Sequence, residues 1–121
     1  MAQRTAHEPE LSEGEAVAEF QKAVKDHPDA QSHFNLGSAY YVAHDLEHAL
    51  PELEETVRLA PDNYHAFYYL GVIYKVRGNK DKARQAFDKI LKGGAQTMLK
   101  NQATIQLKSL DNSSGDAKLG R

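Results

Sequence analysis

Histidines and acidic clusters are the side chains of this sequence whose types and spacing could perform chemistry. The chain holds six His and no Cys, which excludes disulfides, thiolate metal sites and a cysteine nucleophile. His44 and His48 stand four positions apart and could share one helix face as metal ligands. A structural zinc site needs further ligands at a fixed spacing, and none follows. We therefore expect solvated histidines and no metal site.

Catalytic and phosphate-binding motifs are absent from the sequence. It contains no Gly-rich phosphate loop, no Ser/His/Asp arrangement and no paired acidic motif, and Glu52, Glu54 and Glu55 are typical of a solvated helix face. We expect neither an enzyme nor a cofactor.

A run of basic residues between positions 75 and 84 raises the question of nucleic-acid binding. The sequence pI is about 6.3, and the neighbouring aromatic residues belong to a helix-packing pattern, so we expect no nucleic-acid partner. The basic residues are Lys75, Arg77, Lys80, Lys82 and Arg84.

Length and composition predict one small domain. The chain has 121 residues, of which 40% are hydrophobic and 26% charged, enough to form a core without disulfides. Its most apolar run, residues 66–74, is far shorter than the roughly 20 residues that cross a bilayer. The first ten residues hold no apolar stretch typical of a signal peptide. We expect no direct membrane insertion and a cytoplasmic location.

The two halves of the chain carry opposite charge. Residues 1–63 contain 13 acidic and 4 basic residues, a net charge of −9, whereas residues 64–121 contain 4 acidic and 11 basic residues, a net charge of +7. In an elongated molecule this separation favours head-to-tail contact and orients a partner.

An internal repeat decides the expected architecture. When the sequence is aligned with itself at an offset of 34, six similar pairs match, and at an offset of 33 a half-length copy, residues 16–28, aligns with residues 49–61. The pairs are Leu36/Leu70, Gly37/Gly71, Tyr40/Tyr74, Asp45/Asn79, Ala49/Ala83 and Leu53/Phe87.

Each full copy is predicted to form an antiparallel pair of helices. Apolar residues recur at helical spacing, and Gly78-Asn79 supplies a glycine stop followed by an N-cap. His44 replaces that glycine in the first copy and is expected to adopt a positive φ. Ser12 and Glu15 form a capping box that starts the first helix, residues 13–25. Pro51 lies about six residues into the second helix predicted for the first full copy, where it removes one backbone hydrogen bond.

These positions resemble the tetratricopeptide repeat (TPR) family over roughly residues 11–97. The second copy supplies Phe67, Leu70-Gly71, Tyr74, Ala83 and Phe87. The resemblance implies an all-α, right-handed α-solenoid of antiparallel helix hairpins with a C-terminal capping helix. The expected parts are a flexible N-terminus 1–10, a half repeat 11–29, repeats 30–63 and 64–97, a capping helix 98–110 and a disordered tail 111–121.

The resemblance further implies a concave groove lined by the first helices of the repeats. Exposed aromatic residues there would provide contact area for a peptide. The implied function is a non-enzymatic interaction module, an adaptor or scaffold that binds a peptide or helix of a protein partner. The expected groove residues are Phe34, Asn35, Ser38, Tyr41, His65, Tyr68, Tyr69, Val72 and Lys75.

Two alternatives stay open. Tyr68 or Tyr69 could instead pack between repeats or against the capping helix. The protein could also self-assemble as a homo-oligomer through the apolar face of the half repeat, which includes Val17, Phe20 and Val24 and lacks its first helix. A TPR subclass that binds chaperone carboxyl termini is not matched, because only Asn35 agrees with its clamp.

Overall fold

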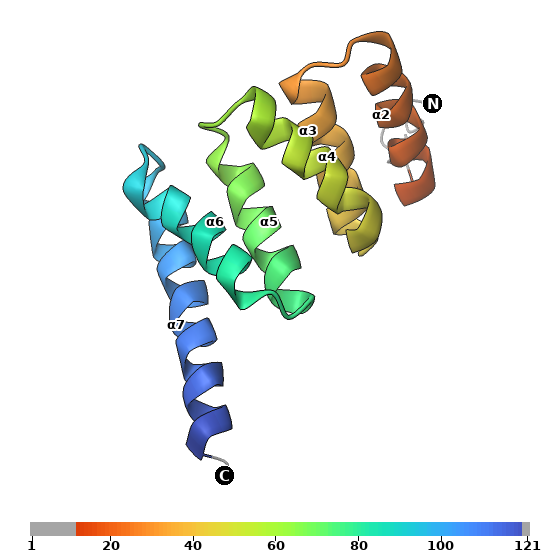
Figure 1. Cartoon of the computed structure of the whole chain (residues 1–121). Helices are drawn as coiled ribbons and strands as arrows, with labels where there is room; N and C mark the ends of the chain where they lie inside the picture. The colour runs from red at the N-terminus through yellow and green to blue at the C-terminus, as the bar shows by residue number, and fades with distance from the viewer. Residues whose placement is uncertain (1–11, 120–121) are drawn as a thin grey trace, which may run out of the picture.

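A stack of helices forms the part of the chain that the computed structural model describes, residues 12–119, and no strand occurs there (Figure 1). The predicted flexible N-terminus, residues 1–10, lies outside the described residues. The helices follow one another in chain order across the stack, so the all-α solenoid architecture is confirmed. They are α2 (Glu13–Asp26), α3 (Ala30–Val42), α4 (Leu46–Leu59), α5 (Tyr64–Val76), α6 (Lys80–Lys92) and α7 (Thr97–Leu119).

Short polar side chains start the helices. The predicted capping box at α2 is confirmed, since the Glu15 backbone N–H donates to Ser12 Oγ and the Ser12 N–H donates to the Glu15 carboxylate. Asp45, Asn63 and Asn79 each accept a hydrogen bond from the backbone N–H of the residue three positions later. Each cap satisfies one of the backbone donors that a helix start leaves unpaired.

The turn within each hairpin is built the same way in both units. His44 has φ 64° and Gly78 has φ 82°, so the histidine adopts the left-handed conformation expected of it. The next residue donates its backbone N–H to a carbonyl of the preceding helix, from Asp45 to Tyr40 and from Asn79 to Tyr74, both at 2.8 Å. This bonding pattern ends a helix and reverses the chain within a short turn.

Two glycines allow the paired helices to approach closely. A Cβ at Gly37 would lie 2.8 Å from a Leu53 side-chain atom, and one at Gly71 would lie 2.5 Å from the Phe87 ring. Leu53 and Phe87 are fully buried. The packing role predicted for the repeated glycines is therefore confirmed.

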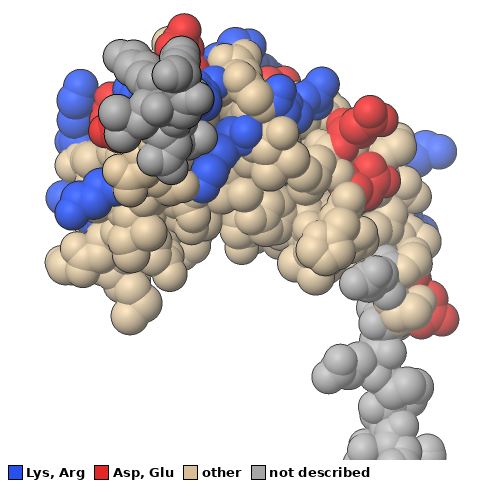
Figure 2. All heavy atoms as spheres, turned by 90° about the horizontal axis from the view of Figure 1, so that it is seen from below, with Lys and Arg blue, Asp and Glu red and all other residues tan. Residues whose placement is uncertain are grey.

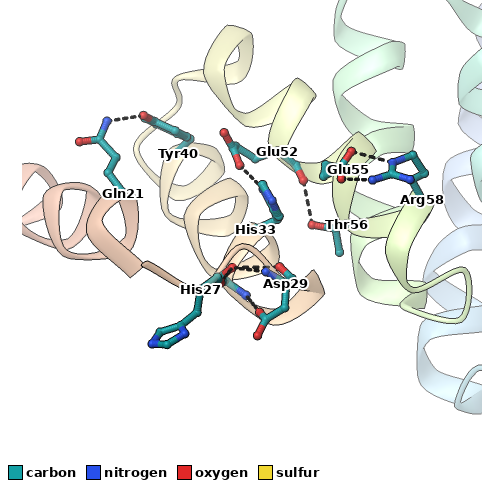
Figure 3. Close-up of polar contacts among 10 residues, drawn as sticks. Gln21, His27, Asp29, His33, Tyr40, Glu52, Glu55, Thr56 and Arg58 are labelled. Carbon is teal, nitrogen blue, oxygen red and sulfur yellow. Dashed lines mark hydrogen bonds and ion pairs between the residues drawn. The ribbon is translucent and has the colours of Figure 1, made fainter. Parts of the chain in front are cut away.

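A polar pair replaces apolar packing in the first unit (Figure 3). His33 Nδ1 is hydrogen-bonded to Glu52 Oε1 at 2.7 Å, and both side chains are largely buried, with 15% and 24% exposed. The equivalent positions of the second unit are Phe67 and Ala86, which pack in an apolar cluster.

The last helix is longer than the sequence predicts. The capping helix was expected to end at residue 110, before a disordered tail, but α7 continues to Leu119. Leu110 is buried, and Arg84 on α6 forms an ion pair with Asp111 at 2.8 Å. These contacts hold the helix as far as Asp111, and no proline follows to stop it.

Neighbour contacts show how the stack curves. The first helix of each unit touches the next one, α3 with α5 and α5 with α7, whereas α2, α4 and α6 do not come close to one another in the described residues. The first helices therefore lie on the inner side of an arch. Figure 2 shows this arch from below, with an uncharged hollow side and charged side chains gathered over the outer side.

Candidate functional site

Exposed apolar side chains mark the inner side of the arch. Val42, Val76, Met98 and Ile105 are 61–73% exposed, whereas the core residues of the stack are at most 6% exposed. All four lie on first helices, namely α3, α5 and α7. We call these four residues, together with the half-buried Val72, the apolar strip.

The repeat explains why these residues share one face. Val42 and Val76 occupy equivalent positions at the offset of 34, and Val72 and Ile105 occupy equivalent positions at the offset of 33 that relates α5 to α7. Equivalent positions on stacked helices point the same way, so the apolar strip runs across the concave face. Exposed apolar residues that gather on one face are typical of a protein-binding face.

Aromatic rings join α3 to α5 beside the apolar strip. Tyr69 stacks on Tyr41 with ring centroids 4.4 Å apart and on Phe34 at 6.2 Å, and Tyr68 meets Tyr69 edge-on at 6.4 Å. Burial, followed by the nearby Tyr68 and Tyr69 hydroxyls, raises the pKa of the Tyr41 phenol. All four rings are half-buried, so each still presents an edge to solvent.

Two of the expected groove residues tie α5 to α7 instead of standing free. Lys75 Nζ donates to Gln106 Oε1 at 2.9 Å and to Ser109 Oγ at 2.8 Å. Gln106 Nε2 in turn donates to the Tyr68 hydroxyl at 3.1 Å. The polar ends of Tyr68 and Lys75 are therefore used in holding the last helix against the second unit, as the packing alternative anticipated for Tyr68.

Among the remaining expected groove residues, some side chains are exposed to solvent and others are buried or hydrogen-bonded within the chain. His65 is exposed at the start of α5, and the Asn35 side-chain oxygen accepts a hydrogen bond from Gln31 on its own helix. Ser38 Oγ is buried and makes no hydrogen bond among the described residues. It lies in the wall of a cavity between α2 and α3.

Sequence reasoning missed Met98 and Ile105. The apolar stripe of residues 98–110 predicts a capping helix but carries no information about the opposite face of that helix. Applying the same offset of 33 to His65 and Val72 leads directly to these positions. They extend the concave face onto α7.

Histidine and charged side chains of the described residues form local pairs and no cluster that could bind a metal ion. The described residues contain no group of three or more potential metal-ligating side chains. His48 is bonded to Asp45 at 2.8 Å and stacks on Tyr40. Among the basic residues considered above, Arg84 is paired with Asp111. No described helix is long and apolar enough to cross a membrane.

Known proteins place the chain in a family. The model of the tetratricopeptide repeat matches residues 14–54 and 34–96, which together span more than half of the chain. No curated protein matches the sequence. Among solved structures, the crystal structure of MamA is similar with a TM-score of 0.54 and 18% sequence identity, over 97% of this chain and 95% of that chain, a likeness of fold alone. The chain belongs to the tetratricopeptide repeat family.

Proposed function

We propose that the concave face binds an amphipathic helix or extended peptide of another protein, so that the protein acts as an adaptor or scaffold. Repeats of this family generally mediate protein–protein interaction, and such proteins are typically non-enzymatic scaffolds. The single observation that supports the specific site is the apolar strip, since four of the five exposed large apolar residues in the described part of the chain lie on it.

The chemistry of the concave face favours an apolar partner segment. Val42, Val76 and Ile105 offer side chains that gain free energy when they leave water. The adjacent Tyr41 and Tyr69 rings are already stacked and lose little rotamer freedom on binding. We therefore expect a partner whose apolar residues recur on one side, with few charges facing the arch.

Val76→Ser and Ile105→Ser test this assignment. Peptides would be selected from a random display library with the wild-type chain, labelled, and titrated by fluorescence anisotropy. Each substitution is expected to weaken binding by about fivefold to thirtyfold, that is by about 1–2 kcal/mol, since a central apolar contact is lost. Circular dichroism checks that both variants remain folded.

Leu59→Ser provides the matched control. Leu59 is the fifth exposed apolar residue, 41% exposed, but it ends α4, a second helix outside the apolar strip. The same loss of hydrophobicity there should leave the peptide affinity unchanged. Equal weakening in all three variants, or none in Val76→Ser and Ile105→Ser, would contradict the concave site.

A further inference from the structure

The two ends of the described stack are incomplete in complementary ways. A complete unit pairs a first helix with a second helix, as α3 pairs with α4 and α5 with α6. Among the described residues, α2 is a second helix that touches only α3, and α7 is a first helix that touches only α5 and α6. One end therefore lacks a first helix, and the other lacks a second helix.

A cavity occupies the place beside α2 where a first helix would stand. Its volume is about 370 Å³, and most of its wall is apolar, from Ala16 and Phe20 on α2 and Phe34 and Ala39 on α3. Ser38 Oγ, in the same wall, is buried without a hydrogen-bond partner in the described chain. A helix that filled this place would cover the apolar wall.

We propose that α7 of a second copy of this chain fills this position. Copies would then associate head to tail, and α7 of one copy and α2 of the next would form the missing hairpin between them. The cavity shares Val42 with the apolar strip, but this proposal concerns the ends of the stack and does not depend on peptide binding elsewhere on the concave face.

The repeat register predicts a specific ion pair across this contact. Within the first unit, His33 on the first helix contacts Glu52 on the second at 2.7 Å. We call the hairpin that α7 of one copy would form with α2 of the next the composite hairpin. Its equivalent residues are Lys100 on α7 and Glu19 on α2. The first and last helices thus carry opposite charges where the complete unit carries its own polar pair.

The contact between successive first helices is complementary as well. Phe34 stacks on Tyr69 where α3 meets α5. At the composite contact the equivalent residues are Asn101 and Asn35, two amides that can donate to and accept from each other. The net charges of −9 and +7 on the two halves favour this head-to-tail polarity over a symmetric contact.

Thr104 makes the association weak and reversible. It stands where the second unit has Gly71, and its counterpart on α2 is Phe20, equivalent to Phe87. Because a Cβ at Gly71 would already lie 2.5 Å from the Phe87 ring, a threonine keeps the composite hairpin wider than the internal ones. A head-to-tail contact that does not close on itself builds open chains of copies.

Charge reversal tests the register. Sedimentation velocity of the full chain at low salt should show an average mass that rises with concentration and falls near 0.5 M NaCl. Glu19→Lys and Lys100→Glu should each weaken association by about tenfold, because like charges then face each other. An equimolar mixture of the two variants should recover wild-type association, because the two reversed side chains then face each other with opposite charges.

Lys25→Glu and Val76→Ser are the controls. Lys25→Glu changes the net charge as much as Lys100→Glu but has no predicted contact and adds to the charge of the acidic half, so it should not weaken association. Val76→Ser affects the concave face and should also leave association unchanged.

Three outcomes would overturn the proposal. The first is a wild-type chain that stays monomeric up to millimolar concentration. The second is association that ignores both charge reversals or is not restored in the mixture. The third is a monomeric wild type that associates once residues 2–10 are deleted, which would assign the position to the chain's own N-terminal segment.

Discussion

Gly71→Ala tests a close helix–helix contact of the stack. The new Cβ would lie 2.5 Å from the ring of Phe87, which is fully buried and has no open space to move into. Overpacking of this kind costs about 1–3 kcal/mol of the free energy of unfolding. The higher helix propensity of alanine returns about 0.5–1 kcal/mol. We expect a net loss of about 1–2 kcal/mol.

The first unit indicates which second substitution should relieve the clash. There Gly37 faces Leu53 in place of a phenylalanine. Phe87→Leu alone should cost about 1–2 kcal/mol through lost contacts and a small cavity. In the double variant Gly71→Ala/Phe87→Leu, the smaller side chain makes room for the methyl group. We expect the double variant to be about 1 kcal/mol more stable than the sum of the single losses predicts.

Urea unfolding at 25 °C, followed by circular dichroism, measures the free energy of unfolding of the wild type, the two single variants and the double variant. Gly14→Ala is the control, because a Cβ at Gly14 on α2 meets nothing within 4 Å and should gain about 0.5–1 kcal/mol. Losses at Gly71 and Phe87 that add within about 0.5 kcal/mol would refute the clash as the cause. A gain in Gly71→Ala equal to that in Gly14→Ala would refute it equally.

Four further substitutions test local features of the backbone and caps. His44→Gly should raise the free energy of unfolding by about 0.5–1 kcal/mol in the same urea assay, because it removes the strain of a positive φ, whereas Gly78→Ala should lower it by about 1 kcal/mol. Pro51→Ala restores a backbone donor inside α4 and should raise stability by up to about 3 kcal/mol, seen as a higher Tm; a lower Tm would mean that the proline ring stabilises the helix by packing. The hydrogen bond from the Ser32 backbone lowers the pKa of Asp29, so this carboxylate stabilises the fold above its unfolded-state pKa, and the stabilisation is lost as the pH falls through the folded pKa. Asp29→Asn should therefore flatten the fall of the urea midpoint between about pH 5 and pH 2, and an unchanged slope would show that other groups cause it.

The repeat made most of the helical architecture predictable. The two offsets, 34 and 33, identify the hairpins, and short polar caps and the Gly78 turn mark where the helices begin and end. The length of α7 was not predictable in this way, because the contacts that hold it at Leu110 and Asp111, such as the ion pair of Asp111 with Arg84, are distant in sequence. Local composition around Asp111 favours a tail, whereas the helix continues through it to Leu119.

The candidate site was predicted less completely than the fold. Helical phase alone could not decide whether Tyr68 faces a groove or a neighbouring helix, since that depends on where Gln106 lies in space. The exposure of Met98 and Ile105 could be inferred only after α7 was placed in register with α5. Buried positions can be recognised from the sequence because the same residue types recur in each unit. The role of a surface position depends on which residues of neighbouring helices contact it, and the repeat pattern does not contain that information.

The His33–Glu52 pair has a consequence for the fidelity of folding. Two hairpins built on one pattern could exchange partners, α3 with α6 or α5 with α4. The first exchange would set His33 against Ala86, and the second would set Phe67 against the Glu52 carboxylate, so each leaves a polar group facing an apolar one in a packed contact. Only the correct pairing matches polar with polar and apolar with apolar. The pair thus distinguishes two otherwise similar units while the chain assembles, at a position where a second Phe/Ala combination would have made them interchangeable.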